Sequence, residues 1–305
     1  MVPIAVAPAP TWDWVRRAIE DAGGEIVELP NAAALVWLRP DDPAGLKDAL
    51  SAAPALRWVQ LPWAGIEPYA AGGLLDGDRV WTCGKGVYAE PVAEHALALA
   101  LAGLRHLPER VRASSWGAES GRSLFDGAVT ILGGGGIAQT LTSLLVPMRT
   151  RVTVVRRDPT RPVSGAAAVV GPEELDDAVA TADVVVVALA LTDATRGIVG
   201  AAQLRRMQPH AWLVNVGRGP HVVTDDLVTA LREGWIAGAA LDVTDPEPLP
   251  DGHPLWSLPN CLITPHTANT FEMAVPLLAA RISENVARFA AGEPLVGVVD
   301  VAAGY

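Results

Sequence analysis

A run of four glycines is the first feature of the sequence that could bind a ligand. It follows the apolar segment AVTIL and precedes a helix-like pattern, and Gly133, Gly135 and Ala138 fit the spacing G-x-G-x-x-G/A. Gly133 permits a tight turn, and Gly135 lets a pyrophosphate approach backbone N–H groups. A helix beginning near Gly136 and Ile137 would favour that anion. The segment predicts a dinucleotide site, although the motif alone also fits a glycine-rich loop without a ligand.

The residues about twenty positions further on indicate which dinucleotide is bound. A site specific for NAD has an Asp or Glu there, which binds the ribose hydroxyl. Here the segment RVTVV ends in Arg156 and Arg157, and two guanidinium groups suit a 2′-phosphate. The sequence therefore favours NADP over NAD. The alternative is that both arginines are ordinary surface charges and that Asp158 makes the ribose contact.

Three later segments place charged or titratable residues at the ends of predicted strands. They are LVNVGRGPHVVTDDLVTAL around Arg218, GAALDVTDPEPLP around Asp242 and Glu247, and LITPHTA around His266. Ligands bind at the carboxyl ends of strands in open α/β sheets. With the ILGGGGIA turn, these segments resemble the D-isomer-specific 2-hydroxyacid dehydrogenases, of the glyoxylate/hydroxypyruvate reductase type. The resemblance covers about the last two thirds of the chain, in the family's order.

The resemblance implies a role for each of these residues. His266 would donate and accept the proton, Glu247 would be its carboxylate partner, and Arg218 would hold the substrate's carboxylate and carbonyl oxygen. Reduction of a 2-keto acid needs a hydride, a proton and a cation, which a nicotinamide, a histidine and an arginine supply. A carboxylate beside an imidazole also favours its charged form. Taken one at a time, the residues have equally good structural explanations. His266 could be a half-buried structural histidine, Arg218 a member of a surface ion pair, and Glu247 a solvated loop carboxylate.

Further binding residues follow from the same resemblance. Asp242 would contact the nicotinamide carboxamide, unless it only caps a turn, and backbone near Val216 would line the ring. In the first part of the chain, LPWAGIEP is similar to the family's substrate loop, with backbone N–H groups of Ala64 and Gly65 facing the substrate carboxylate. The sequence departs from the family at Ala138, in place of a third glycine, and in ALALT, which lacks the usual proline before Thr192. The other histidines are expected to be structural or surface residues: His95, His106, His210, His221 and His253.

Strand-length apolar segments alternate with helix-length segments along the whole chain, which is typical of parallel sheets covered by helices. A first series ends near RVWTC, and a second begins at AVTIL after a long helical stretch from Glu90. We expect an α/β protein with two doubly wound parallel sheets, a Rossmann cofactor domain and a flavodoxin-like substrate domain. A last helical stretch, from Glu272 to Ala291, would return to the first domain. The expected domains are residues 1–98 with 275–305, and residues 99–274.

Composition narrows the possible partners. The 305 residues carry 23 Lys and Arg against 34 Asp and Glu, a net charge of −11, which makes nucleic acid an unlikely partner. The 2 cysteines show neither disulfide nor zinc spacing, so we expect no metal and a reducing cytoplasm. No signal or membrane segment is apparent. The apolar helix from Val92 to Leu107 suggests a homodimer.

The sequence thus predicts an oxidoreductase that transfers a hydride from NAD(P)H to a small 2-keto acid, with NADP preferred, to give the D-2-hydroxy acid. Glyoxylate and hydroxypyruvate are the expected kind of substrate. The alternative is a cofactor-sensing protein, similar to corepressors of this fold, that binds NAD(P) and a partner without physiological turnover. The joint presence of Arg218, Glu247 and His266 favours the enzyme.

Overall fold

The computed structural model describes residues 1–301, and the chain divides into two compact units. One comprises Met1–Tyr88 and the chain from Thr270 onward, and the other comprises Ala89–Asn269. The boundaries expected from the sequence, at 98/99 and 274/275, fall inside helices α4 (Ala89–Leu104) and α11 (Phe271–Ala291). Each of these helices belongs whole to one unit, so both divisions lie at the start of a helix.

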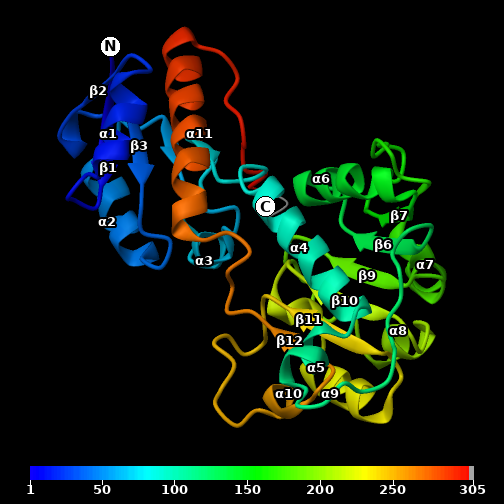
Figure 1. Ribbon diagram of the computed structural model, residues 1–305. Coiled ribbons are helices and arrows are strands. Elements are labelled where there is room, and N and C mark those ends of the chain that lie inside the picture. Colours follow the sequence, from blue (N-terminus) through cyan, green and yellow to red (C-terminus); the bar gives the residue numbers. More distant parts are fainter. Residues whose placement is uncertain (302–305) are drawn as a thin grey trace. The chain divides into compact units, whose positions relative to one another are not determined.

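The first unit contains a parallel five-stranded sheet in the order β2-β1-β3-β4-β5, which is the flavodoxin-like order. Its strands are β1 (Val2–Ala7), β2 (Gly24–Ile26), β3 (Ala34–Trp37), β4 (Trp58–Gln60) and β5 (Val80–Thr82). Its helices are α1 (Asp13–Glu20), α2 (Pro43–Ala52), α3 (Glu67–Ala71) and α11, with a 3-10 turn at Leu29–Asn31. Both faces of the sheet are covered, because α1 and α11 pack with Ile4 and Trp58, whereas α2 and α3 pack with Leu35 and Val59 (Figure 1).

The second unit contains a parallel seven-stranded sheet in the order β12-β11-β10-β9-β6-β7-β8. Its strands are β6 (Ala128–Leu132), β7 (Arg151–Val155), β8 (Ala168–Val170), β9 (Val184–Val187), β10 (Trp212–Asn215), β11 (Gly238–Leu241) and β12 (Cys261–Ile263). From β8 to β11 the order is that of the Rossmann fold. The two doubly wound sheets confirm the fold class predicted from the sequence.

Helices cover both faces of this second sheet (Figure 1). They are α4, α5 (Leu107–Arg112), α6 (Gly136–Leu145), α7 (Leu175–Ala180), α8 (Ala201–Arg206), α9 (Thr224–Glu233) and α10 (Pro254–Ser257), with 3-10 turns at Val146–Met148, Pro172–Glu174 and Gly219–His221. The buried run of β9 alternates between the faces, since Val184 and Val186 pack with α4 and α6 and the other two valines pack with α7, α8 and α9.

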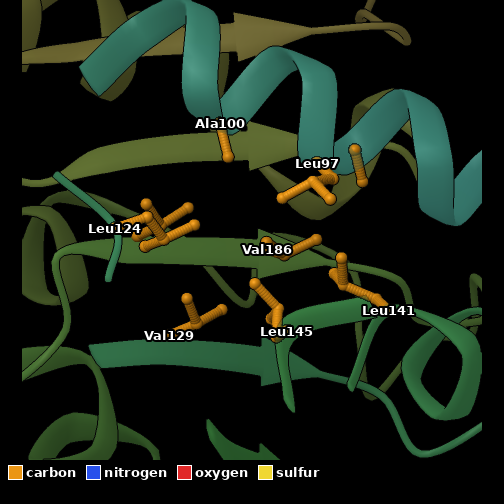
Figure 2. Close-up of a pocket in the computed structure, with 9 residues that line it drawn as sticks. Leu97, Ala100, Leu124, Val129, Leu141, Leu145 and Val186 are labelled. Carbon is orange, nitrogen blue, oxygen red and sulfur yellow. The ribbon is translucent and has the colours of Figure 1, made fainter. Parts of the chain in front are cut away.

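A small apolar gap lies between α4, α6 and the sheet. Figure 2 shows Leu97 and Ala100 of α4 above Val186, with Leu141 and Leu145 of α6 beside them. The gap is lined by Ala96, Leu97, Ala100, Leu124, Val129, Leu141, Leu145, Val184 and Val186. Because every one of these side chains is apolar, the gap offers nothing to hold a charged substrate.

The long helical stretch expected from Glu90 onward is broken in the structure. It ends at Leu104, and His106 takes a left-handed conformation (φ +54°) before α5 begins. The apolar helix predicted to reach Leu107 is therefore shorter, and its Ala93, Leu99 and Ala100 are buried within the unit. Among the described helices, none is long and apolar enough to span a bilayer.

Candidate active site

The glycine turn joins β6 to α6, where the sequence predicts the dinucleotide. Gly133 has φ +115°, and a Cβ there would lie 2.4 Å from the carbonyl oxygen of Ala188, so both backbone conformation and space require glycine. A Cβ on Gly135 would meet nothing within 4 Å, so the turn is open on that side. Helix α6 begins with Gly136 and Ile137, and no side chain of the described residues caps its N-terminus. Its N–H groups are therefore donors suited to a pyrophosphate.

Two arginines follow β7 beside this turn. The half-buried Arg156 lies against Gly134, since a Cβ on that glycine would come within 2.8 Å of the arginine Cδ and Nε. Arg157 is exposed. The Asp158 carboxylate accepts hydrogen bonds from the Thr160 hydroxyl at 2.6 Å and the Thr160 N–H at 3.2 Å. The hydrogen bond from the Thr160 hydroxyl lowers the pKa of Asp158, and both contacts from Thr160 fall on the same carboxylate oxygen, Oδ1.

Arg218 follows β10, and side chains fix its main chain on both sides. Its N–H donates to Nδ1 of His221 at 3.1 Å. Its carbonyl oxygen accepts from Nδ2 of Asn215 at 2.9 Å. Asn215 also accepts from the N–H of Gly217 at 3.1 Å, and Val216 is buried between them. The guanidinium donates from Nη1 to the Gly217 carbonyl at 2.8 Å.

The loop that carries Glu247 is pressed against the Arg218 turn. A Cβ on Gly219 would lie 1.9 Å from the Thr244 carbonyl oxygen, so there is no room for a side chain where the two loops meet. The Thr224 hydroxyl, at the start of α9, donates to the Asp245 carbonyl at 2.7 Å and holds the same loop. Thr224 is the first residue of this helix, and its N-cap is Val223.

His266 and Glu247 meet after β12 and β11. Nδ1 of His266 lies 2.7 Å from Oε1 of Glu247, and the two side chains are 53% and 41% exposed. His266 has a left-handed backbone (φ +52°), which few non-glycine residues adopt. With Nδ1 bonded to the carboxylate, Nε2 is the ring nitrogen left to exchange a proton with a substrate.

Asp242 holds the segment that carries His266. The Asp242 side chain is 2% exposed, and its oxygens accept from the N–H groups of Thr267 at 2.9 Å and Ala268 at 3.0 Å. The Thr264 hydroxyl donates to Oδ1 at 2.5 Å, and Nε2 of His95 lies 3.0 Å from that hydroxyl and 3.4 Å from Oδ1. Burial raises the pKa of Asp242, but these hydrogen bonds outweigh burial and hold it at about 2.

The predicted substrate loop belongs to the other unit and follows β4. Ala64 is exposed and Gly65 is half-buried. The Gly84 N–H donates to the Trp63 carbonyl at 3.0 Å, and the Tyr88 hydroxyl donates to the Pro62 carbonyl at 2.7 Å. The indole of Trp63 lies 5.5 Å from the Tyr88 ring, so it packs within its own unit. The roles of Ala64 and Gly65 stay a prediction.

Four residues of these networks were missed by sequence reasoning: His95, Asn215, His221 and Thr264. Asn215 ends β10 and Thr264 follows β12, so the strand-end rule that found Asp242 could have found both. His221 stands three positions after Arg218, a spacing that suits a side chain bonding back to a backbone N–H. His95 lies within α4, where nothing in the sequence distinguishes it from a packing residue.

The fold and the site together define a class of protein, the dinucleotide-dependent oxidoreductases built on two parallel sheets. The model of the family described as D-isomer specific 2-hydroxyacid dehydrogenase, NAD binding domain, matches residues 95–268. An uncharacterized protein from the proB 3′ region of Corynebacterium melassecola is 42% identical to the chain, with 96% of this chain and 97% of the relative covered. The chain belongs to the D-isomer specific 2-hydroxyacid dehydrogenase family.

Relatives and solved structures with named activities are also similar to this chain. A glyoxylate reductase of Aeropyrum pernix is 34% identical, over 81% of this chain and 77% of its own length. A D-isomer specific 2-hydroxyacid dehydrogenase from Xanthobacter autotrophicus Py2, in complex with NADPH and MES, superposes with a TM-score of 0.87 at 30% identity, covering 100% of this chain and 99% of that one. The NADPH-dependent glyoxylate/hydroxypyruvate reductase of Sinorhizobium meliloti, in complex with NADP and sulfate, superposes with a TM-score of 0.82 at 26% identity, covering 100% of both chains.

Proposed function

We propose that this enzyme uses NADPH to reduce a small 2-keto acid, of the glyoxylate or hydroxypyruvate type, to the D-2-hydroxy acid. The observation that carries the proposal is the 2.7 Å contact between His266 Nδ1 and Glu247 Oε1, on the sheet edge that also carries Arg218. The activities named for the Aeropyrum and Sinorhizobium proteins support the substrate class. The complete set of Arg218, Glu247 and His266 supports turnover rather than cofactor sensing alone.

The residues of the chain divide the chemistry among them. Arg218 presents a planar guanidinium to the substrate carboxylate and the carbonyl oxygen, and polarises the carbonyl. Glu247 orients the imidazole of His266 through Nδ1, so that Nε2 faces the substrate and gives a proton to the carbonyl oxygen. When bound, the nicotinamide supplies the hydride. Asp242 holds the His266 segment; its predicted contact with the carboxamide, and that of backbone near Val216 with the ring, are part of the proposal.

Preference for NADP over NAD rests on the residues after β7. Arg156 lies against the glycine turn, and the exposed Arg157 follows it in the chain, which supports a role for both in binding a ribose phosphate. Asp158 is bonded to Thr160 instead. The Xanthobacter and Sinorhizobium proteins bind NADPH or NADP in their structures, which supports the same choice.

The proposal is tested by following oxidation of NADPH and NADH with glyoxylate, hydroxypyruvate, pyruvate and phenylpyruvate. We expect turnover with NADPH and one of the first two acids, and a loss of kcat of at least about a hundredfold in His266→Gln. An R156S/R157S double variant should lose most of its preference for NADPH while keeping turnover with NADH. Cofactor binding without turnover of any of these acids would contradict the proposal and favour a sensing protein.

The proposal also includes a homodimer and a reducing compartment. Several exposed apolar side chains follow α4 along the chain: Leu107 is 47% exposed, Val111 85% and Trp116 96%. Such side chains are costly to leave in water, and a second copy would cover them. Cys83 and Cys261 are buried free thiols, which supports a compartment where disulfides do not form.

A further inference from the structure

His221 is a fully buried histidine, 0% exposed, whose ring lies between two loops at the carboxyl edge of the second sheet. It is the last residue of the 3-10 turn Gly219–His221, and this turn begins directly after Arg218. A buried imidazole needs a partner for each nitrogen, and here the partners are backbone groups of different loops. Nδ1 faces the N–H of Arg218 at 3.1 Å, and Nε2 faces the carbonyl oxygen of Ala190 at 3.2 Å.

These two contacts fix the proton on the ring. A backbone N–H can only donate, so Nδ1 must accept and carries no proton. A carbonyl oxygen can only accept, so Nε2 must carry the proton and donate it to Ala190. His221 is therefore the neutral Nε2–H tautomer, and the Ala190 carbonyl selects the tautomer that accepts from Arg218.

The surroundings leave the ring little freedom to take another position. A Cβ on Gly217 would lie 3.1 Å from Nδ1 of His221 and 3.3 Å from the Leu189 carbonyl oxygen, so glycine makes room for both. The N–H of His221 donates back to the Arg218 carbonyl at 3.2 Å. The Ala190 carbonyl also accepts from the Thr195 hydroxyl at 2.8 Å, which holds that loop in place.

The Ala190 loop in turn borders the glycine turn, because the Ala188 carbonyl lies against Gly133. One imidazole therefore links the main chain of the proposed substrate-binding arginine to the loop beside the proposed cofactor site. Arg218 can hold a carboxylate in a productive geometry only if its backbone is held, since small displacements of a positioning group are costly in catalysis.

We propose that His221 is a positioning residue for Arg218, acting as a buried neutral hydrogen-bond acceptor whose tautomer is set by Ala190. The inference rests on the proposed function, since it assigns to Arg218 the binding of a keto acid's carboxylate. Its effect falls mainly on substrate binding and less on cofactor binding, and His221 takes no part in proton transfer.

Two amide variants distinguish the hydrogen-bonding roles of the two ring nitrogens, Nδ1 and Nε2. In His221→Asn the side-chain oxygen takes the place of Nδ1 and keeps the acceptor for Arg218. In His221→Gln the amide extends to the place of Nε2, keeps a donor toward Ala190 and leaves the Arg218 N–H without its acceptor. His221→Leu removes both. We expect the KM for the keto acid to rise about tenfold or more in the Gln and Leu variants, which is the effect of losing one buried hydrogen bond.

The Asn variant should stay within about threefold of the wild-type KM, and in all three variants the Kd for NADPH, read from its fluorescence, should change less than the KM. A residue with only a structural role would weaken cofactor and substrate binding together, and Asn would not rescue it. Equal KM values in wild type and the Leu variant would overturn the proposal. So would an Asn variant as impaired as Leu while folded by circular dichroism.

Two further readouts need no turnover. Nitrogen NMR of histidine-labelled protein should show His221 unprotonated at Nδ1 and protonated at Nε2, with His221→Gln identifying the signal. The opposite tautomer would overturn the inference.

The second readout is the binding of oxalate, a substrate-like probe, in the presence of NADPH. Oxalate binding lost in Gln and kept in Asn, with no turnover by the wild type, would preserve the inference and reject the proposed function. Oxalate binding equal in all variants would reject the inference.

Discussion

The Asp242 carboxylate shows how single hydrogen bonds decide the chemistry of this site. Burial alone raises the pKa of a carboxyl group, since it penalises the charge. Bonds from His95, Thr264 and two backbone N–H groups reverse that effect and lower the pKa of Asp242 from 3.8 to about 2. The charged carboxylate is thereby part of the folded state, and it fixes the main chain that presents His266.

This lowered pKa makes a prediction for stability. The native state binds the Asp242 proton less readily than the unfolded chain, so its stabilisation is present above pH 4 and disappears as pH falls toward 2. The shift corresponds to about 2 kcal/mol in the free energy of unfolding. Asp242→Asn should therefore be less stable than wild type near pH 6 by at least that amount, and the gap should shrink by about 2 kcal/mol between pH 4 and pH 2.

Urea unfolding at several pH values measures the gap. Asp251→Asn, which removes one exposed charge from a turn, is the matched control and should differ little from wild type. A gap between wild type and Asp242→Asn that stays constant from pH 6 to pH 2 would show that the carboxylate is not held in its charged form.

At the scale of elements, α4 approaches β10 through a glycine. A Cβ on Gly103 would lie 2.4 Å from the Trp212 ring, which is itself 3% exposed. Alanine gains about 1 kcal/mol of helix propensity over glycine, but overpacking of a core costs about 1–3 kcal/mol. Because the ring is enclosed and cannot retreat, we expect Gly103→Ala to destabilise the protein by about 1 kcal/mol or more.

Thermal or urea unfolding tests this balance. Ala98→Gly, at an exposed position of the same helix, measures the propensity difference alone and should cost about 1 kcal/mol. If Gly103→Ala were instead more stable than wild type, the contact between α4 and β10 would be looser than the structure has it.

The elements of this fold were largely predictable because their signals are local. Apolar runs such as Val184–Val187 and the glycine turn after Leu132 are short patterns, and charged residues at strand ends indicate where a site forms. The break at His106 was missed from the sequence, although Pro108 lies in the first turn of α5, where a proline is typical of a new helix start. His95 was not predictable, because its partner Thr264 is 169 positions away and only the fold brings them together.

At the scale of the whole molecule, surface composition limits what it associates with. A net charge of −11 opposes binding to other acidic polymers. Against this acidic background, the segment after α4 presents exposed apolar side chains, including Phe125 at 52% exposure, together with the exposed Arg122 and the half-buried Arg110. The sequence predicts that the apolar helix from Val92 to Leu107 forms the dimer contact. In the structure much of α4 is buried, and the exposed apolar side chains belong to the residues that follow it.

A second copy of the chain is the partner that we propose for this segment. A stable dimer needs about 800 Å² buried on each partner, with large apolar side chains near the centre. Val111 and Trp116, 85% and 96% exposed, add almost nothing to the core of the monomer, so replacing them should leave the fold intact. Sedimentation at about 10 µM should therefore give a dimer for the wild type and a monomer for Val111→Asp combined with Trp116→Ser.

Met273→Ser is the matched control, since Met273 is 51% exposed but lies on α11 in the other unit. It should remain a dimer. A wild type that sediments as a monomer at that concentration would reject the dimer itself. A double variant that stays dimeric, with unchanged circular dichroism, would instead place the interface elsewhere, because loss of two large apolar contacts at an interface centre weakens association by at least about a hundredfold.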